Sequence, residues 1–130
     1  MASSKLTQVL GNYEKAFAAL NKAQASPVTE ERDLGGIIKA FEIVYELAWK
    51  ALKLALLEQG QDTSGPKDVF GKGFILGFLS DEKIWLKIIE DRNLTVHTYN
   101  QPLAEQMVAR IKGSYLRAFA DLKVKLAKSA

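Results

Sequence analysis

Hydrophobic residues recur at helical spacing along almost the whole chain, and no segment shows the alternation typical of a strand. A first helix is predicted from about Ser4 to Gln24, and a second, the longest, from about Thr29 to Gln59. Ser26-Pro27 interrupts the pattern between them, and Gly60 suits the position that follows a helix C-terminus. The first half of the chain therefore predicts two long amphipathic helices.

The second half of the chain predicts three further helices. Pro66 opens a short one that runs to about Leu79, and its three glycines each cost about 1 kcal/mol relative to alanine. Ser80 caps a helix that reaches at least Arg92, and the last helix follows Asn100-Gln101-Pro102. Because the connections are short, we expect an all-α fold, an up-and-down four-helix bundle with one additional short helix. Residues 1–130 would form it as a single domain.

Composition narrows the class of protein without naming an activity. Hydrophobic residues make up 48% and charged residues 25%, which is ordinary for a globular domain. The chain has no cysteine and one histidine, so we expect no metal site and predict no cofactor. No apolar run resembles a signal peptide or reaches the length of a membrane span, which predicts a cytoplasmic protein with no membrane segment.

The basic residues gather toward the C-terminus. The chain contains 18 lysines and arginines against 15 acids, and a net charge of +3 is too small to indicate nucleic-acid binding. After Met107 the only acid is Asp121, whereas the basic residues are Arg110, Lys112, Arg117, Lys123, Lys125 and Lys128. A solvated helix face is the ordinary interpretation, and contact with a polyanion or an acidic partner is the alternative.

Arg92 occupies an unusual position in the predicted fourth helix. On a helical wheel it falls in the middle of an apolar stripe, formed by Trp85, Ile88, Ile89 and Val96. A guanidinium stays protonated, and burying it without partners would cost several kcal/mol. Glu46 and Asp91 are the candidate acids to pair with it, and both are expected to line any site there. An internal Arg92–Glu46 pair that fixes helix register is one interpretation, and phosphate binding is another.

Three further residues with useful chemistry follow Arg92 closely. His97 lies one helical turn after Asn93, whereas Arg92 and His97 diverge by about 140° on a straight helix. A histidine can move protons near neutral pH, and an arginine can neutralise charge that builds on phosphorus. Tyr99 by itself is expected to cap the bundle with its hydroxyl in water. Together these residues predict a polar site suited to a phosphodiester, without naming a substrate.

Three segments of the chain together resemble a known family. They are Phe41-Glu42-Ile43-Val44-Tyr45-Glu46-Leu47-Ala48-Trp49-Lys50, Pro66-Lys67-Asp68-Val69-Phe70 and Glu90-Asp91-Arg92-Asn93-Leu94-Thr95-Val96-His97-Thr98-Tyr99. Over most of its length the chain resembles the nucleotidyltransferase substrate-binding family of the HEPN superfamily, and the toxin half of HepT/MntA-type modules. Arg92, His97 and Tyr99, with their spacing, match the superfamily signature.

The resemblance implies a homodimer in which Arg92 and His97 of both subunits line a cleft. It also implies a metal-independent endoribonuclease toxin, which leaves a 2′,3′-cyclic phosphate and a 5′-hydroxyl on the cut RNA. His97 would move protons, Arg92 would stabilise the pentavalent phosphorus, and Asn93 would orient one of them. The implied partner is a small nucleotidyltransferase that neutralises the toxin, in some systems by adding AMP to the tyrosine of the motif, here Tyr99.

Two other functions fit the same residues. In the first, the chain is a non-catalytic subunit that holds a substrate or nucleotide for the nucleotidyltransferase, which predicts complex formation without RNA cleavage. In the second, the bundle contains a structural arginine–glutamate pair and no site. Replacing Arg92 would then mainly lower the melting temperature.

Overall fold

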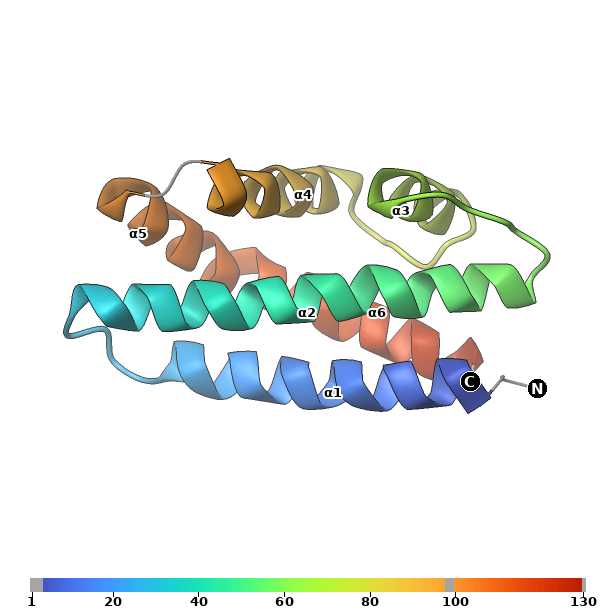
Figure 1. The fold of residues 1–130 in the computed structure, drawn as a ribbon, viewed down its shortest axis with the longest axis horizontal. Coiled ribbons are helices and arrows are strands. Elements are labelled where there is room, and N and C mark those ends of the chain that lie inside the picture. The colour runs from blue at the N-terminus through green and yellow to red at the C-terminus, as the bar shows by residue number, and fades with distance from the viewer. Residues whose placement is uncertain (1–3, 98–99, 130) are drawn as a thin grey trace.

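The computed structural model describes residues 4–97 and 100–129, which form helices joined by short connections (Figure 1). The helices are α1 (Ser4–Ala25), α2 (Glu31–Glu58), α3 (Pro66–Ile75), α4 (Glu82–His97), α5 (Gln101–Arg110) and α6 (Leu116–Ser129), with a π-helical turn, η1 (Ile111–Tyr115), between the last two. Since α5, η1 and α6 follow one another without a gap, they form the predicted last helix. This helix, α1, α2 and α4 alternate in direction, and α3 is the short extra helix, so the predicted bundle is confirmed (Figure 1).

The C-terminus of α2 is closed as the sequence predicts. Gly60 adopts a φ of 79°, a left-handed conformation that glycine reaches without steric cost. The backbone N–H of Gln61 donates to the carbonyl of Leu56, and that of Gly60 donates to the carbonyl of Leu57. This pair of bonds is a Schellman motif, and it confirms Gly60 as the residue that ends the helix.

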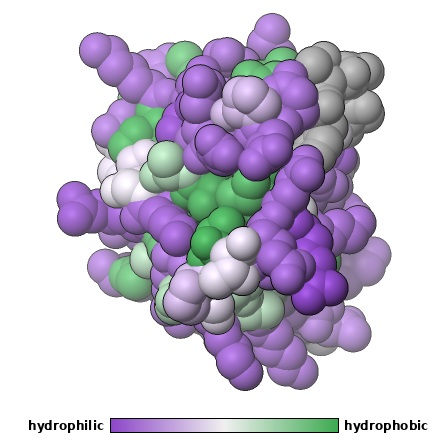
Figure 2. Space-filling model, turned by 90° about the vertical axis from the view of Figure 1, so that its left-hand side faces the viewer, coloured by the Kyte–Doolittle hydropathy of each residue, from purple (hydrophilic) through white to green (hydrophobic). Residues whose placement is uncertain are grey.

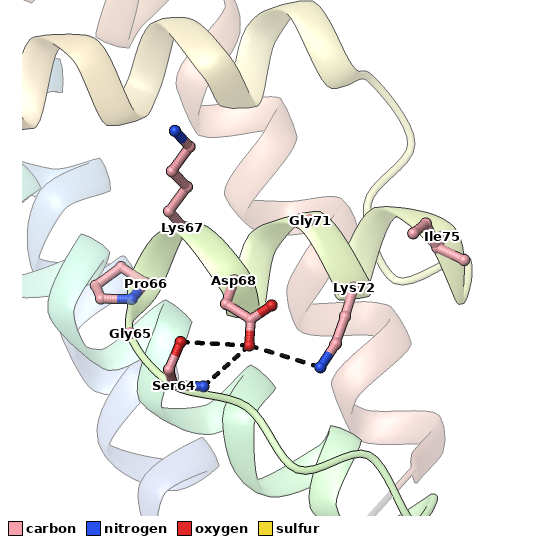
Figure 3. Close-up of a pocket in the computed structure, with 8 residues that line it drawn as sticks. All are labelled: Ser64, Gly65, Pro66, Lys67, Asp68, Gly71, Lys72 and Ile75. Atoms are coloured by element: carbon pink, nitrogen blue, oxygen red, sulfur yellow. Dashed lines mark hydrogen bonds and ion pairs between the residues drawn. The ribbon is translucent and has the colours of Figure 1, made fainter.

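Carboxylates accept backbone hydrogen bonds at the N-terminal ends of α3 and α4. The Asp68 carboxylate accepts a hydrogen bond from the backbone N–H of Ser64 at 3.0 Å, at the foot of α3 (Figure 3). At α4 the carboxylate of Asp81 accepts from the N–H of Ile84 at 3.2 Å. Asp81, and not Ser80, therefore caps α4, which corrects the predicted cap by one residue.

The third helix is shorter than predicted. It ends at Ile75, whereas the sequence pattern extended it to about Leu79. Gly77 has a φ of 84° and turns the chain out of the helix. Phe78 and Leu79 are nonetheless buried, because the turn folds them back into the core. Their apolar character continued the helical pattern past the true end of the helix.

A continuous cluster of aromatic rings joins α2, α3, α4 and the last helix in the core. Adjacent rings have centroids 5.1 to 6.0 Å apart, and each such pair contributes about 0.5–1.5 kcal/mol beyond its buried area. The rings are Tyr45, Phe70, Trp85, Phe119, Phe41 and Tyr115. The cluster therefore fixes α4 against α2, which are the two helices that carry the candidate site.

Apolar side chains also remain on the outside of the bundle. A groove of about 330 Å³ lies between α3 and α4, and it includes Ile75 and Leu86, which are 80% and 58% exposed.

The end of the bundle at which α2 and α5 begin is mostly hydrophilic around a small apolar depression (Figure 2). None of the described helices is both long enough and apolar enough to cross a membrane.

Candidate functional site

Arg92 on α4 pairs with Glu46 on α2. Its Nη2 donates to Oε1 of Glu46 at 3.3 Å, and its guanidinium carbon lies 5.8 Å from the centre of the Tyr45 ring. A cation above an aromatic face is attracted by the ring quadrupole. The Arg92 side chain is 21% exposed, so it is partly buried where α4 faces α2. The predicted Arg92–Glu46 pair is confirmed.

The Glu46 carboxylate is held from a second side. The indole Nε1 of Trp49, one turn further along α2, donates to its other oxygen at 3.1 Å. Burial, followed by the nearby Glu46 charge, raises the pKa of Tyr45, and the Arg92 charge opposes this rise. Tyr45 therefore stays neutral near neutral pH. Glu46 and Trp49 are three residues apart on a predicted helix, and this spacing indicates that their side chains are neighbours.

Arg92 keeps most of its hydrogen-bonding capacity unused. Its Nε is buried, and no group among the described residues accepts a hydrogen bond from it. A guanidinium has five N–H donors, and within the described part of the chain only Glu46 accepts one. A buried donor without an acceptor costs about 1–3 kcal/mol. Because Nε is enclosed, an anionic oxygen could satisfy it only after the Arg92 side chain moves. The donors that Glu46 does not use remain available to an anion.

Asp91 faces the last helix, and not the Arg92 site that the sequence predicts it to line. Its side chain is fully buried, and both oxygens are bonded to the last helix. Arg110 donates from Nε at 2.7 Å and from Nη2 at 2.8 Å, and the Tyr115 hydroxyl donates at 2.5 Å. Asp91 therefore does not pair with Arg92, and its carboxylate does not face Glu46.

The helical wheel explains this difference. The buried face of α4 passes through Trp85, Ile88 and Asp91, which are spaced three residues apart. Arg92 lies at the edge of that face instead of at its centre, since one position along a helix rotates the side chain by about 100°. The apolar neighbours of Arg92 did not distinguish between these two placements.

The other residues of the signature are described to different extents. Asn93 is exposed, and α4 continues to His97, so positions 93 and 97 lie one turn apart on one face. The structure describes His97 only as the last helical residue of α4. Because the helix continues through it, positions 92 and 97 lie on different faces of α4. Tyr99 lies outside the described residues.

Sequence reasoning missed the role of Arg110. It was grouped with the basic C-terminal residues of a solvated face, yet its side chain binds the buried Asp91. Lys112, Arg117 and Lys128 do lie exposed, as that interpretation expects. Arg110 directly precedes Ile111 and follows Val108 by two residues, and these apolar, buried neighbours are the signal that separates it from the other basic residues.

Comparisons with known proteins match nearly the whole chain. A family described as nucleotidyltransferase substrate binding protein like matches residues 8–128. A protein of Haemophilus influenzae named probable ribonuclease HepT is 32% identical over 89 residues, which are 65% of this chain. The match spans 61% of that relative, or about three fifths of its length.

Two solved structures have the same fold. A Thermus thermophilus protein matches with a TM-score of 0.79 and 34% identity, over 88% of this chain and 98% of its own. A Haemophilus influenzae structure, described as revealing the fold of a substrate binding domain of a nucleotidyltransferase, matches with a TM-score of 0.76 and 26% identity. The second match covers 91% of this chain and 98% of the other.

Proposed function

This chain belongs to the nucleotidyltransferase substrate binding protein like family, and we propose that it is a HEPN-type subunit that partners a small nucleotidyltransferase. Its proposed activity is metal-independent endoribonucleolytic cleavage, which the partner neutralises. The relative named probable ribonuclease HepT supports the proposed cleavage, and the neighbour described as a substrate binding domain of a nucleotidyltransferase supports the proposed partner. The observation that carries it is the partly buried Arg92, whose Nε has no acceptor among the described residues.

In the proposed reaction, the RNA 2′-hydroxyl attacks the adjacent phosphorus. His97 takes the proton from that hydroxyl as a general base, and the bond between phosphorus and the 5′-oxygen breaks. A protonated His97 returns a proton to the leaving 5′-oxygen, so the products are a 2′,3′-cyclic phosphate and a 5′-hydroxyl. Arg92 stabilises the negative charge on the pentavalent phosphorus, and Asn93 orients the phosphate or the imidazole.

Glu46 orients Arg92 in this proposal without saturating it. It accepts from one Nη atom, and Trp49 fixes the carboxylate that does so. The remaining guanidinium donors stay available to phosphate oxygens, which arginine binds through two parallel hydrogen bonds. The arginine–glutamate pair and anion binding are therefore compatible.

We further propose that two copies of the chain complete the site. Arg92 and His97 diverge by about 140° along one α4, whereas a two-fold axis can bring residues of two copies together. Leu86 lines the apolar groove between α3 and α4. Asn93, seven residues further along, lies on the same face of α4, so the groove runs along the face that carries Asn93. Exposed apolar patches mark contact surfaces. Leu86→Asp should therefore give a monomer in light scattering, while Ile43→Asp, at an exposed position outside the groove, should not.

An RNA cleavage assay in EDTA tests the activity. The wild type should cut single-stranded RNA, and Arg92→Ala and His97→Ala should each lose at least about 100-fold in rate while keeping their circular dichroism. Arg32→Ala, which removes an arginine that is 83% exposed, is the control and should cut normally. Cleavage that persists in both site variants would contradict the proposal.

The non-catalytic binding subunit is the second candidate function. The description of the Haemophilus structure as a substrate binding domain favours it. In that case the wild type binds the nucleotidyltransferase but cuts no RNA, and Arg92→Ala changes the activity or affinity of the partner. A co-purification assay beside the cleavage assay separates the two candidates.

A further inference from the structure

The π-helical turn η1 changes which residues of the last helix share a face. Arg110 and Tyr115 are five residues apart, and on a regular α-helix they would diverge by about 140°. Within η1 the N–H of Leu116 donates to the carbonyl of Ile111, a bond across five residues. A π-turn stacks residues five apart, as an α-helix stacks residues four apart. The turn therefore brings Arg110 and Tyr115 to the same side of the helix.

Both aligned side chains bind one carboxylate. Asp91 accepts two hydrogen bonds from Arg110 and one from the Tyr115 hydroxyl, and it is fully buried. The hydrogen bond with Asp91 raises the pKa of Arg110, and burial together with that carboxylate raises the pKa of Tyr115. Both groups therefore keep their protons through the neutral range. The three-residue cluster stays bonded under the conditions in which the protein would act.

This cluster restrains the rotation of α4 about its own axis. Asp91 immediately precedes Arg92, so the direction of one side chain fixes that of the other, about 100° away. Apolar packing tolerates small rotations of a helix, whereas a bidentate hydrogen bond between an arginine and a carboxylate forms only in a narrow range of orientations. With Asp91 bonded to the last helix, Arg92 faces α2 and meets Glu46 at 3.3 Å.

We infer that Asp91, Arg110 and Tyr115 are positioning residues, aligned by η1, which hold α4 in the rotation that presents Arg92 to Glu46 on α2. None of them forms a hydrogen bond with Arg92 or Glu46 among the described residues, since they lie between α4 and the last helix. Their effect on catalysis rests on the proposed function, but their effect on the placement of Arg92 does not. A buried ion pair of this kind sets geometry more than it adds stability.

Removing the Tyr115 hydroxyl provides the test, because the ring and its packing remain. Tyr115→Phe should shift the Arg92 Nε–Hε resonance in an ¹⁵N NMR spectrum and should lower kcat for RNA by roughly 10- to 100-fold. KM should change by less than about twofold, since the residues do not contact substrate. Asp91→Asn should act in the same direction on both readouts.

Tyr13→Phe is the matched control. Tyr13 is also a fully buried tyrosine, and its hydroxyl donates one hydrogen bond, to the carbonyl of Phe119 at 2.7 Å. This variant loses a comparable buried bond away from Asp91, so it should leave the Arg92 resonance and kcat as in the wild type. If Tyr115→Phe and Tyr13→Phe behave alike in both readouts, the inference is overturned.

The two readouts separate this inference from the proposed function. If the wild type cuts no RNA but Tyr115→Phe moves the Arg92 resonance and Tyr13→Phe does not, the positioning role stands and the ribonuclease assignment fails. If the wild type cuts RNA and the Arg92 resonance is the same in all variants, the ribonuclease assignment stands and the positioning role fails.

Discussion

Nη2 of Arg92 lies 3.3 Å from Oε1 of Glu46, although 46 residues separate the two in the chain. The Glu46 side chain is 38% exposed, so water screens the pair on one side. Exposed and partly exposed ion pairs contribute at most about 1 kcal/mol. The contact therefore orients Arg92 more than it stabilises the bundle.

Replacing Arg92 should consequently change the free energy of unfolding little. Arg92→Met keeps an apolar stem at this position and removes the charge. We expect urea denaturation to give a loss of about 1 kcal/mol or less. A loss of about 3–5 kcal/mol, typical of a broken buried pair, would support a purely structural arginine instead.

The Asp91–Arg110 pair should behave in the opposite way. Arg110→Leu leaves the fully buried Asp91 charge without its main partner, so the free energy of unfolding should fall by about 3–5 kcal/mol. Arg117→Leu, at an exposed position on the same helix, should change it by about 0.5 kcal/mol or less. Equal effects of the two substitutions in urea denaturation would contradict the role assigned to Asp91.

Two glycines in α3 should respond differently to alanine. A Cβ at Gly71 meets no atom within 4 Å, so Gly71→Ala should raise the free energy of unfolding by up to about 1 kcal/mol through helix propensity. A Cβ at Gly73 would lie 2.6 Å from Cδ2 of the fully buried Leu52. Gly73→Ala should therefore lower it by about 1–3 kcal/mol, the cost of overpacking. Thermal denaturation of both variants would check the contrast, and a stabilised Gly73→Ala would contradict the close packing of α3 on α2.

The Asp68 carboxylate, in the first turn of α3, should make stability depend on pH on the acid side. Its hydrogen bond from the Ser64 backbone, with Lys72 nearby, lowers the pKa of Asp68 from its ordinary value of 3.8 (Figure 3). The folded pKa lies below the unfolded one, so the stabilisation is complete above 3.8 and is lost as pH falls through the folded value. The melting temperature of Asp68→Asn should thus be lower than that of the wild type at neutral pH, and the gap should close in acid. A gap that does not change with pH would exclude this carboxylate as the cause.

Hydrophobic periodicity predicted most of the fold. Of the site, it predicted the Arg92–Glu46 pair but not the role of Asp91. Helical spacing placed the long helices, and Gly60 marked the end of α2 because few other residues adopt its φ of 79°. Arg92 was identified because a charge within an apolar stripe needs a partner, and Glu46 is that partner. Both inferences depend on a local cost that the sequence alone reveals, the steric cost of a positive φ at position 60 and the cost of burying the Arg92 charge.

The Asp91 cluster could not be predicted in the same way. Hydrophobic spacing determines a helix face to within about one residue, which is the difference between burying Asp91 and burying Arg92. The alignment of Arg110 with Tyr115 depends on η1, and apolar periodicity carries no signal for a single π-turn. The end of α3 was missed for a related reason, since the buried Phe78 continues the apolar pattern beyond the helix.

The chemical identity of the cut RNA ends tests the assignment of Arg92 and His97 to RNA cleavage most directly. With EDTA present, mass spectrometry of the products should find a 2′,3′-cyclic phosphate and a 5′-hydroxyl. A single 2′-deoxynucleotide at the cut position should abolish cleavage there, because the 2′-hydroxyl is the proposed nucleophile. Products with 3′-hydroxyl and 5′-phosphate ends, or cutting at the deoxy position, would show that water is the nucleophile and would contradict the proposed mechanism.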